Sequence, residues 1–343
     1  MLNRLELSNF TVFKNADIRF SKGLNVLIGE NGTGKSHLLK LGYGMNKIAR
    51  IAAQAAFDKD TMGVQLASAL VNLFKPDALG RLATRQQGQS ACEVCVTFRG
   101  GGTLRFAFST KSSKRVESQE FNITKAPVRA LFIPPKEVLS IYPGFAQSIS
   151  DRELAFDDTY HDLCRDLERR PLKGPRFASI AELLTPLEAM LGGSISQEGE
   201  QFYLKSGKGI LEVQLLAEGY RKIGQIAYLL KNGSLMHNGI LFWDEPETNL
   251  NPKNIKNIAT MLIALVRYGI QVVIATHSLF LMRELHIQNT SDAVPALFTE
   301  LFFNEDGAVQ VKQEKELDRL PKIAALEEEL SQSDRFLNGR AGE

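Results

Sequence analysis

The feature of this chain that most constrains its fold is a glycine-rich segment at residues 29–36, which reads GENGTGKS. An apolar run at residues 24–28 precedes it, and a run with helical character at residues 37–41 follows it. Glycines in this pattern let backbone N–H groups turn toward phosphates, and the N-terminus of the following helix favours negative charge. The segment therefore predicts a strand, a phosphate-binding loop and a helix of an α/β fold that binds a nucleoside triphosphate.

Two side chains of this loop have separate expected roles. Lys35 can reach the β- and γ-phosphate oxygens, and the hydroxyl of Ser36 can take one position around Mg²⁺. An ordinary glycine turn is the alternative, and the strand before the loop and the helix after it make that alternative less favourable. We expect the loop and the histidine after it to contact the nucleotide through Gly29, Glu30, Asn31, Gly32, Thr33, Gly34, Lys35, Ser36 and His37.

A second motif lies far downstream, where the apolar run ILFW at residues 240–243 ends in Asp244 and Glu245. The run predicts a buried strand that brings Asp244 to Mg²⁺ and Glu245 to the water that attacks the γ-phosphate. Glu245 would orient or deprotonate that water. Two solvated acids at a strand end are the alternative, which the sequence PETNLNP at residues 246–252 makes less favourable.

A third motif is the sequence THS at residues 276–278, which follows an apolar run at residues 271–275. Ligands of open α/β sheets bind at the carboxyl ends of the strands, so His277 is expected to donate a hydrogen bond to the γ-phosphate. The alternative is a core histidine whose hydrogen bonds are satisfied within the protein. The position of His277 directly after a motif strand favours the catalytic role.

Together these motifs resemble the signatures of the ABC-type ATPases of the SMC, RecF and OLD group. The resemblance rests on DEPETNLNP at residues 244–252, on ATHS at residues 275–278 and on LELSNF at residues 5–10, and it covers residues 1–45 and 210–305. It implies an α/β fold, the ABC-type P-loop ATPase head, in which helices flank a mixed sheet. It also implies ATP and Mg²⁺ as cofactors, and a homodimer or higher oligomer around two Mg-ATP molecules.

Members of this family present the N-terminus of a signature helix to the ATP bound by the opposite subunit. The best match is residues 216–222, LAEGYRK, followed by a helical run at residues 223–230. The resemblance assigns nucleotide contacts to Glu218, Gly219 and Asn249. Many relatives carry a serine where this chain has Ala217, so the contact would rest on backbone N–H groups and the helix dipole, with Arg221 or Lys222 as candidate contributors. An amphipathic helix with a glycine near its start is the alternative.

Two further family elements find no match. The strand expected at residues 128–133 is followed by Pro-Pro-Lys-Glu, without the glutamine that relatives carry there. Thr11 occupies the position where relatives often have a basic residue after an Asn-Phe pair. Both roles are left unassigned.

The segment between the phosphate loop and the signature exceeds the needs of a minimal ABC-type head. Its periodicity predicts helices at residues 61–74, 158–169 and 180–191, and strands at residues 92–98, 103–108 and 118–124. We expect a discontinuous ATP-binding core (residues 1–60 and 205–313), a second lobe with an inserted α+β region that serves as a lid or docking surface (residues 61–204), and a C-terminal helical tail (residues 314–343). Within the tail, a helix is expected at residues 317–330, and strands precede it at residues 296–303 and 308–312.

Composition limits the classes of partner. The chain has 41 basic and 39 acidic residues and a net charge of +2, which is unlike a wholly basic nucleic-acid protein. Basic residues do cluster at Arg165, Arg169, Arg170, Lys173 and Arg176, where a solvated face interleaved with acids is favoured over a nucleic-acid contact. Nucleic acid stays open as a partner, and no secretion signal or membrane span is expected.

The cysteines bear on the compartment of the protein. Cys92 and Cys95 form a C-x-x-C pair, and the third cysteine is Cys164. The pair falls in a strand-like run without a glycine knuckle or a second paired half, so reduced strand cysteines are favoured over a zinc site. An odd number of cysteines suits the reducing cytoplasm.

The motifs predict an ATP hydrolase. The chain lacks a sustained heptad arm, a Glu plus D-x-D nuclease pattern and an H-N-H motif. Its segment at residues 324–335 resembles the tails of antiphage ATPases that work with a nuclease, so we expect it to regulate a separate effector, a nuclease or toxin. The alternative is a RecF-like DNA repair ATPase. A transporter subunit fits less well because it requires an L-S-G-G-Q signature and a glutamine loop.

Overall fold

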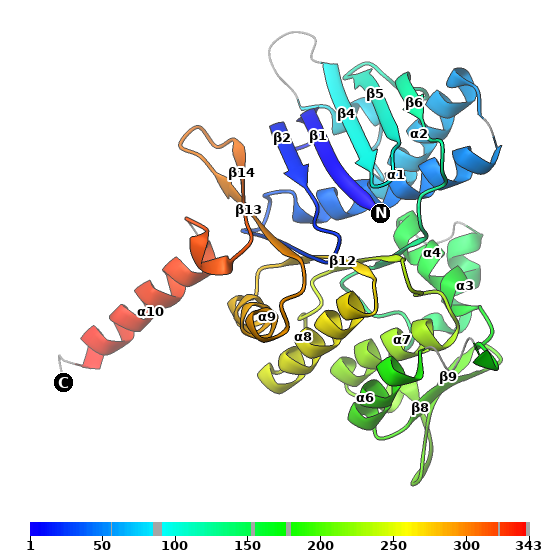
Figure 1. Ribbon diagram of the computed structural model, residues 1–343, viewed down its shortest axis with the longest axis vertical. Coiled ribbons are helices and arrows are strands. Elements are labelled where there is room, and N and C mark those ends of the chain that lie inside the picture. The colour runs from blue at the N-terminus through cyan, green and yellow to red at the C-terminus, as the bar shows by residue number, and fades with distance from the viewer. Residues whose placement is uncertain (56, 85–90, 152–154, 176–179, 322, 341–343) are drawn as a thin grey trace.

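The computed structural model describes residues 1–343 except 56, 85–90, 152–154, 176–179, 322 and 341–343. The described strands form sheets of five, six and three strands, with helices between and around them (Figure 1). In the view of Figure 1 the five-stranded sheet lies at the top and the three-stranded sheet at the bottom. The six-stranded sheet lies between them and leads into the phosphate loop.

The five-stranded sheet is antiparallel, in the order β2-β1-β4-β5-β6. Its strands are β1 (Leu2–Phe10), β2 (Phe13–Arg19), β4 (Ala91–Phe98), β5 (Thr103–Ser109) and β6 (Glu117–Asn122). In β2, Phe13, Ala16 and Ile18 are buried and the other residues are exposed. This alternation is typical of a sheet that packs one face on the core and exposes the other.

The six-stranded sheet has the order β14-β13-β3-β12-β11-β7, and all its strands are parallel except the edge strand β14. The strands are β3 (Leu24–Gly29), β7 (Ala130–Ile133), β11 (Ile240–Asp244), β12 (Gln271–Thr276), β13 (Ala296–Phe303) and β14 (Val309–Glu314). Every residue of β11 and β12 is buried. Such continuous burial requires helices on both faces of the sheet.

Adjacent residues of β11 show how both faces are covered. Phe242 packs in a cluster with Leu5 of the five-stranded sheet and Leu41 of α1 (Lys35–Ala55), so α1 fills the space between the two sheets. Its neighbour Trp243 points to the opposite face, because side chains alternate along a strand. There it joins the cluster that includes residues of α7 (Glu218–Lys231), α8 (Pro252–Arg267) and α9 (Leu279–Asp292).

The three-stranded sheet consists of β8 (Ser194–Glu198), β9 (Gln201–Ser206) and β10 (Gly209–Glu212). The helices α3 (Tyr142–Ser150), α4 (Asp158–Leu167) and α6 (Ala181–Leu191) belong to the same end of the molecule (Figure 1). The sequence analysis missed this sheet. All residues of β10 are exposed, so the strand carries no apolar alternation that could have revealed it.

Most other predicted elements are confirmed, including a mixed sheet flanked by helices. The helix expected at residues 61–74 is α2 (Lys59–Phe74), and the expected strands of the second lobe correspond to β4, β5 and β6. Cys92, Cys95 and Cys164 are buried free thiols, and no group of three or more metal-ligating His, Cys, Asp or Glu residues occurs in the described part of the chain.

The helix expected at residues 317–330 is wrong in its first half. The structure has a 3₁₀ turn, Leu317–Arg319, and the helix α10 (Ala324–Arg340) begins only afterwards. Leu320 is extended, with φ −76° and ψ 133°, because Pro321 disfavours the helical conformation of the residue before it. Helix α10 then extends away from the body of the molecule (Figure 1). Among the described helices, none combines the length and apolar character needed to cross a membrane.

A buried glutamine links the two large sheets. The backbone N–H of Leu2 donates to Gln271 Oε1 at 2.9 Å, and Gln271 Nε2 donates to the carbonyls of Leu2 at 2.9 Å and Ser21 at 2.7 Å. Gln271 is the first residue of β12 and is fully buried. It therefore fixes the start of β1 against the parallel sheet that carries the nucleotide loop.

We expect Gln271→Leu to lower the free energy of unfolding by about 2–4 kcal/mol, because two buried backbone groups of Leu2 and the partly buried carbonyl of Ser21 lose their partner. Urea unfolding followed by circular dichroism measures this change. Gln313→Leu is the matched control, since Gln313 makes the same pair of hydrogen bonds to Arg19 in a more exposed setting, together with one to the Thr299 hydroxyl at 2.8 Å. For Gln313→Leu we expect the free energy of unfolding to fall by less than about 1 kcal/mol, because water can replace the lost partner. Equal costs for the two variants would contradict the linking role of Gln271.

Candidate functional site

The three motifs converge at one edge of the six-stranded sheet. Strands β3, β12 and β11 are adjacent and parallel, so their carboxyl ends lie side by side. The phosphate loop follows β3, Asp244 ends β11, and His277 follows β12. Ligand sites of open α/β sheets lie at this edge.

The loop has a backbone that requires glycine at two positions. Gly32 and Gly34 have φ of 84° and 91°, in the left-handed region that favours glycine. A Cβ on Gly34 would lie 2.6 Å from Phe13 Cζ and 2.7 Å from Val12 Cγ2. The turn between β1 and β2 therefore supports the loop from outside, and no larger residue fits between them.

Lys35 is the first residue of α1, and its side chain folds back over the loop. Its Nζ donates to the carbonyl oxygens of Gly29 at 2.7 Å and Glu30 at 2.8 Å. Burial lowers the pKa of this ammonium, and the carboxylates of Glu245 and Asp244 oppose that shift. The ammonium thus lies at the loop as a charged donor whose present partners are backbone carbonyls.

Asp244 and Ser36 are brought together as the sequence predicted. The Ser36 hydroxyl hydrogen-bonds the Asp244 carboxylate, which lowers the pKa of Asp244, but burial dominates and raises that pKa to about 6. Asp244 Oδ1 has no hydrogen-bonding partner among the described residues. A buried carboxylate oxygen without a partner, beside a hydroxyl, matches the hard oxygen donors that Mg²⁺ prefers, so this pair fits the expected metal.

Glu245 has an unusual backbone conformation. Its φ of 48° lies in the left-handed region, which is uncommon for residues other than glycine and concentrates at functional sites. Its N–H donates to the Ala275 carbonyl at 3.0 Å, and its Oε2 accepts from the Thr248 hydroxyl at 3.2 Å. The strained backbone turns the carboxylate away from β11 and toward His277.

His277 faces Glu245 across the ends of β11 and β12. Its Nδ1 lies 3.4 Å from Glu245 Oε1 and 3.9 Å from Glu247 Oε1, and 53% of its side chain is exposed. This exposure excludes a fully buried core histidine. The ring can therefore reach a ligand and the Glu245 carboxylate together.

Two residues that were not expected at this sheet edge prove central to the site. Glu247 is buried, and its Oε1 accepts from the Thr276 hydroxyl at 2.5 Å and from the His277 N–H at 3.3 Å. Lys222 of α7 is also buried, and its Nζ donates to the Thr248 carbonyl at 2.8 Å. Both side chains orient the segment after Asp244. Only the second acid of the DEPE sequence signalled Glu247, and the sequence suggested Lys222 only as a candidate contact with an opposite subunit.

The signature helix begins earlier than expected. Helix α7 starts at Glu218, and its N-cap residue Ala217 makes no side-chain capping hydrogen bond. The Glu218 carboxylate accepts from Asn249 Nδ2 at 2.9 and 3.0 Å, which brings two of the predicted nucleotide contacts together. Arg221 pairs with Glu137 at 2.8 Å. Because Lys222 is buried against Thr248, only Arg221 of the two candidate contributors keeps a partly exposed side chain.

Other loop residues have different surroundings. Asn31 and Gly32 are exposed, and the Thr33 hydroxyl donates to the Glu30 carbonyl at 2.8 Å. His37 turns away from the loop, with Nδ1 3.0 Å from the Thr11 hydroxyl and its ring edge-on to Phe74. Burial lowers the pKa of this imidazole.

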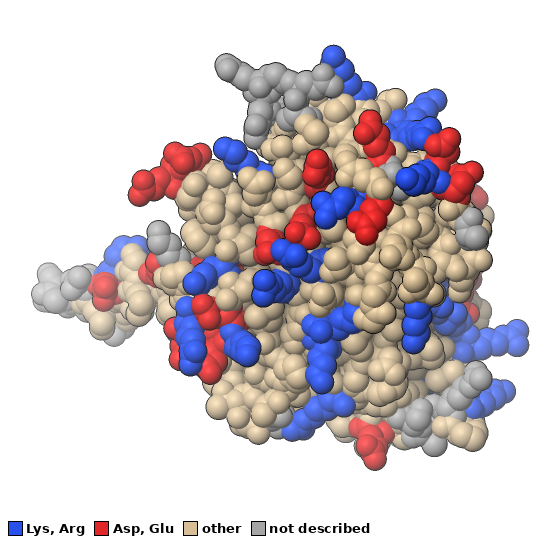
Figure 2. All heavy atoms as spheres, turned by 45° about the horizontal axis from the view of Figure 1, so that its top comes forward, with Lys and Arg blue, Asp and Glu red and all other residues tan. Residues whose placement is uncertain are grey.

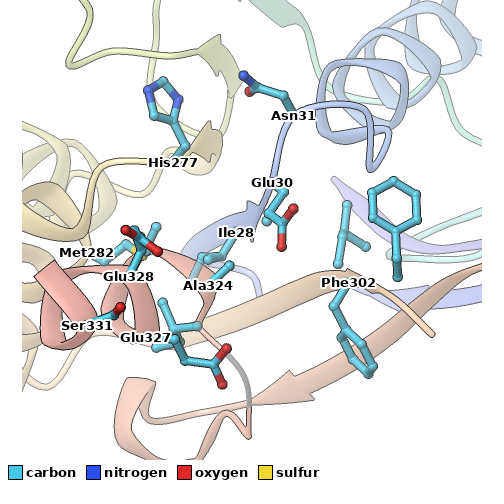
Figure 3. A pocket seen from close by; sticks show the side chains of 15 residues that line it. Ile28, Glu30, Asn31, His277, Met282, Phe302, Ala324, Glu327, Glu328 and Ser331 are labelled. Atoms are coloured by element: carbon cyan, nitrogen blue, oxygen red, sulfur yellow. The ribbon is translucent and has the colours of Figure 1, made fainter. Parts of the chain in front are cut away.

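The C-terminal helix reaches the loop, which the sequence did not predict. A cavity of 970 Å³ extends from Glu30, Asn31 and His277 to the first turns of α10 (Figure 3). Glu327 and Glu328 of α10 border this space (Figure 3). The tail therefore forms part of the surroundings of the phosphate loop.

Two family models match parts of the chain. The model described as "AAA domain, putative AbiEii toxin, Type IV TA system" matches residues 113–283, and a model described as "AAA domain" matches residues 4–41. The first includes the Asp244 and His277 motifs, and the second includes the phosphate loop. The two models thus cover the same motif segments that meet at the sheet edge.

Solved SMC heads share the fold. The chain is similar to an SMC head bound to the C-terminal winged-helix domain of ScpA, with a TM-score of 0.58 and 14% identity over 92% of this chain and 98% of the other. It is also similar to an Smc head with an extended coiled coil bound to the C-terminal domain of ScpA from Pyrococcus furiosus, with a TM-score of 0.51 and 12% identity over 98% and 99% of the two chains.

Among curated proteins, the DNA replication and repair protein RecF of Streptococcus suis matches in two strains, 05ZYH33 and 98HAH33. In each, 50% of 42 residues are identical. The match spans 12% of this chain and 12% of each RecF chain.

The raised pKa of Asp244 predicts a stability that depends on pH. The proton bound to Asp244 stabilises the folded state fully below pH 3.8, and this contribution is lost as the pH rises through about 6. Without nucleotide or Mg²⁺, Asp244→Asn should therefore be more stable than the parent at pH 7.5, by up to about 3 kcal/mol. The difference should shrink toward pH 5 in urea unfolding measured across this range.

The exposed Asp306 provides the control, and Asp306→Asn should show no such pH-dependent difference. A stability gain in Asp244→Asn that is equal at pH 5 and pH 7.5 would show that burial does not hold a proton on Asp244.

The phosphate loop, the acidic pair and the histidine lie at adjacent strand ends. The chain shares its fold with SMC heads, and AAA-domain models match the segments that form both halves of the site. These findings make the chain similar to SMC- and RecF-like ABC-type ATPases in its fold and in the motif segments of its site.

Proposed function

We propose that this ATPase binds Mg-ATP at the sheet edge and hydrolyses it. The observation that carries the proposal is the grouping of Lys35, Asp244, Glu245 and His277 at the ends of three adjacent strands. A loop of backbone donors, an ammonium and two carboxylates match the requirements of phosphoryl transfer, which depends mainly on positioning and charge neutralisation.

Each side chain has one task in this mechanism. Lys35 exchanges its carbonyl partners, Gly29 and Glu30, for β- and γ-phosphate oxygens. Glu245 accepts a hydrogen bond from the attacking water and orients it in line with the γ-phosphate, and His277 donates to a γ-phosphate oxygen. Ser36 and Asp244 would hold Mg²⁺, which neutralises charge on the phosphates when bound.

The proximity of His277 and Glu245 supports this assignment. The imidazole Nδ1 lies 3.4 Å from Glu245 Oε1 and is therefore next to the position proposed for the attacking water. Glu247 accepts from the His277 backbone N–H at 3.3 Å, so the backbone that carries the ring is held in place. The mechanism therefore uses a histidine and a glutamate that are oriented before ATP arrives.

We expect Lys35→Ala to weaken ATP binding at least about tenfold, because the phosphates lose a charged donor. Glu245→Gln should keep ATP affinity within about threefold and lower turnover by about 100-fold or more, because the amide cannot take a proton from water. Fluorescent-nucleotide titration and phosphate release measure the two quantities.

The exposed Lys14 serves as the control, since Lys14→Ala removes the same charge away from the loop. Unimpaired turnover in both Lys35→Ala and Glu245→Gln would refute the site.

We propose further that the head forms a homodimer or higher oligomer in which α7 contacts ATP on the other copy. The exposed Ala217 leaves the first backbone N–H groups of α7 without a side-chain cap, and such groups favour phosphate. Glu218 and Asn249 lie at the same helix start. Light scattering of the Glu245→Gln protein with and without Mg-ATP tests whether the mass doubles, and an unchanged mass would count against the dimer.

The proposed role is regulation of a separate effector, a nuclease or toxin, in antiphage defence. The match to the model described as a putative AbiEii toxin of a Type IV TA system supports a defence role. The similar SMC heads were solved with bound ScpA domains, so a separate polypeptide docks on heads of this fold. Three buried free thiols are consistent with action in the cytoplasm.

The division into a core (residues 1–60 and 205–313), a second lobe (residues 61–204) and a tail (residues 314–343) stays a prediction. Strands β1 and β4 pair across the first boundary, so the core and the second lobe share the five-stranded sheet. The α3–β10 end of the molecule and helix α10 are the proposed docking surfaces for the effector.

A RecF-like role in DNA repair is the second candidate, and the RecF match favours it. We expect tagged Glu245→Gln protein, purified from its host with Mg-ATP, to retain a nuclease or toxin at fixed stoichiometry in mass spectrometry. The Lys35→Ala protein, purified in the same way, is the control and should lose that partner. Recovery of DNA alone would instead support the repair function.

A further inference from the structure

A second concave site lies at the far end of α1 from the phosphate loop. It has a volume of 320 Å³ and is formed by the C-terminal half of α1, the start of β7 and helix α4. Its basic lining residues are Lys47, Arg50, Arg129, Arg165 and Arg169. Arg50 follows Lys35 by about four helical turns, or roughly 22 Å along the axis, so this pocket is separate from the ATP site.

Acidic residues neutralise only part of this charge. Asp162 accepts from Lys47 Nζ at 2.5 Å and from the Tyr43 hydroxyl at 2.7 Å, and Asp166 pairs with Arg129. The other three basic side chains of the pocket form no ion pair within the described residues. The pocket therefore carries three positive charges in excess of its acids.

Three arginines that line this pocket, Arg50, Arg129 and Arg169, are near enough to repel one another. Burial lowers the pKa of Arg169, and the positive charges of Arg129 and Arg50 lower it further, against the opposing effect of Asp166. Like charges held this close destabilise each other unless an anion lies between them. The arrangement thus favours a negatively charged ligand.

A buried amide gives a second, independent observation. Asn46 lines the same pocket and is fully buried, yet neither its Oδ1 nor its Nδ2 has a hydrogen-bonding partner in the described part of the chain. A buried polar group without a partner is costly, and buried amides in folded proteins are usually satisfied. A ligand oxygen or a bridging water in the pocket would supply the missing partner.

We propose that this pocket binds the phosphate group of a nucleotide. Arg50 and Arg169 would hold the phosphate oxygens through their planar guanidinium groups, and Asn46 Nδ2 would face the bound anion. The volume lies at the small end of ligand pockets, which fits a compact ligand rather than a duplex. In Figure 2 positive and negative side chains are interspersed over the upper half of the face, and the mostly positive side chains of the lower half are separated by neutral surface.

The phosphate could come from a free nucleotide or from the phosphorylated end of a nucleic-acid strand, and a titration separates these sources. The full chain with Lys35→Ala removes binding at the ATP site from the measurement. Isothermal titration calorimetry then uses inorganic phosphate, AMP, and a short DNA strand with either a 5′-phosphate or a 5′-hydroxyl. Stronger binding of AMP identifies the free nucleotide, and stronger binding of the 5′-phosphorylated strand identifies the strand end.

We expect Arg50→Ala with Arg169→Ala to lower the affinity for the phosphate-bearing probe at least tenfold. The matched control is Lys111→Ala with Lys208→Ala, which removes the same charge from exposed positions and should leave the affinity unchanged. Failure of every probe to bind, or an equal loss in the control, would overturn the proposal.

Asn46→Leu provides a separate readout. It removes the unpaired amide, so the melting temperature without ligand should stay level or rise, whereas the affinity for the same probe should fall at least tenfold. Loss of affinity in both the arginine variant and Asn46→Leu supports the pocket. Full affinity in either one overturns it.

Discussion

The register of three parallel strands determines the rest of the site. In that register Asp244 pairs with Ala275, and Thr276 pairs with Ile28, so the ends of β11, β12 and β3 are level with one another. Because successive side chains of a strand point to opposite faces, a slip of one residue would turn these groups away from each other. The buried apolar side chains of the same strands oppose such a slip. Hydrophobic packing inside the sheet thereby fixes polar geometry at its edge.

The site concentrates buried ionisable groups that are costly for the folded state. Asp244, Glu247, Lys35 and Lys222 are all buried, and burial shifts the pKa of Asp244 upward and those of the two lysines downward. The two lysines donate hydrogen bonds to loop carbonyls, and the Thr276 hydroxyl donates one to Glu247, which offsets part of this cost. A ligand that brings phosphate and a cation would pair with the remaining charges. The protein thus gives up stability at this edge in order to hold its polar groups in place.

The sequence predicted the parts of the site that depend on short motifs. The phosphate loop, the acids after β11 and the histidine after β12 are local patterns, and the expected meeting of Ser36 with Asp244 follows from parallel strands. The inward direction of Lys222, the link between Gln271 and Leu2, and the cavity shared by α10 and the loop depend on distant partners, so local periodicity could not reveal them. The exposed strand β10 was missed because it carries no apolar alternation.

Helix α10 has a mechanical consequence for the head. Its first turns form a wall of the cavity beside Glu30, while Leu330 and Leu337 farther along are exposed on a part that projects from the body (Figures 1 and 3). The first turns are held to the body, because Leu326 packs against the core and Glu329 pairs with Arg283 at 3.1 Å. A hydrogen-bonded helix is stiff along its axis, so a partner that displaced the projecting end of α10 would also strain these contacts next to the phosphate loop.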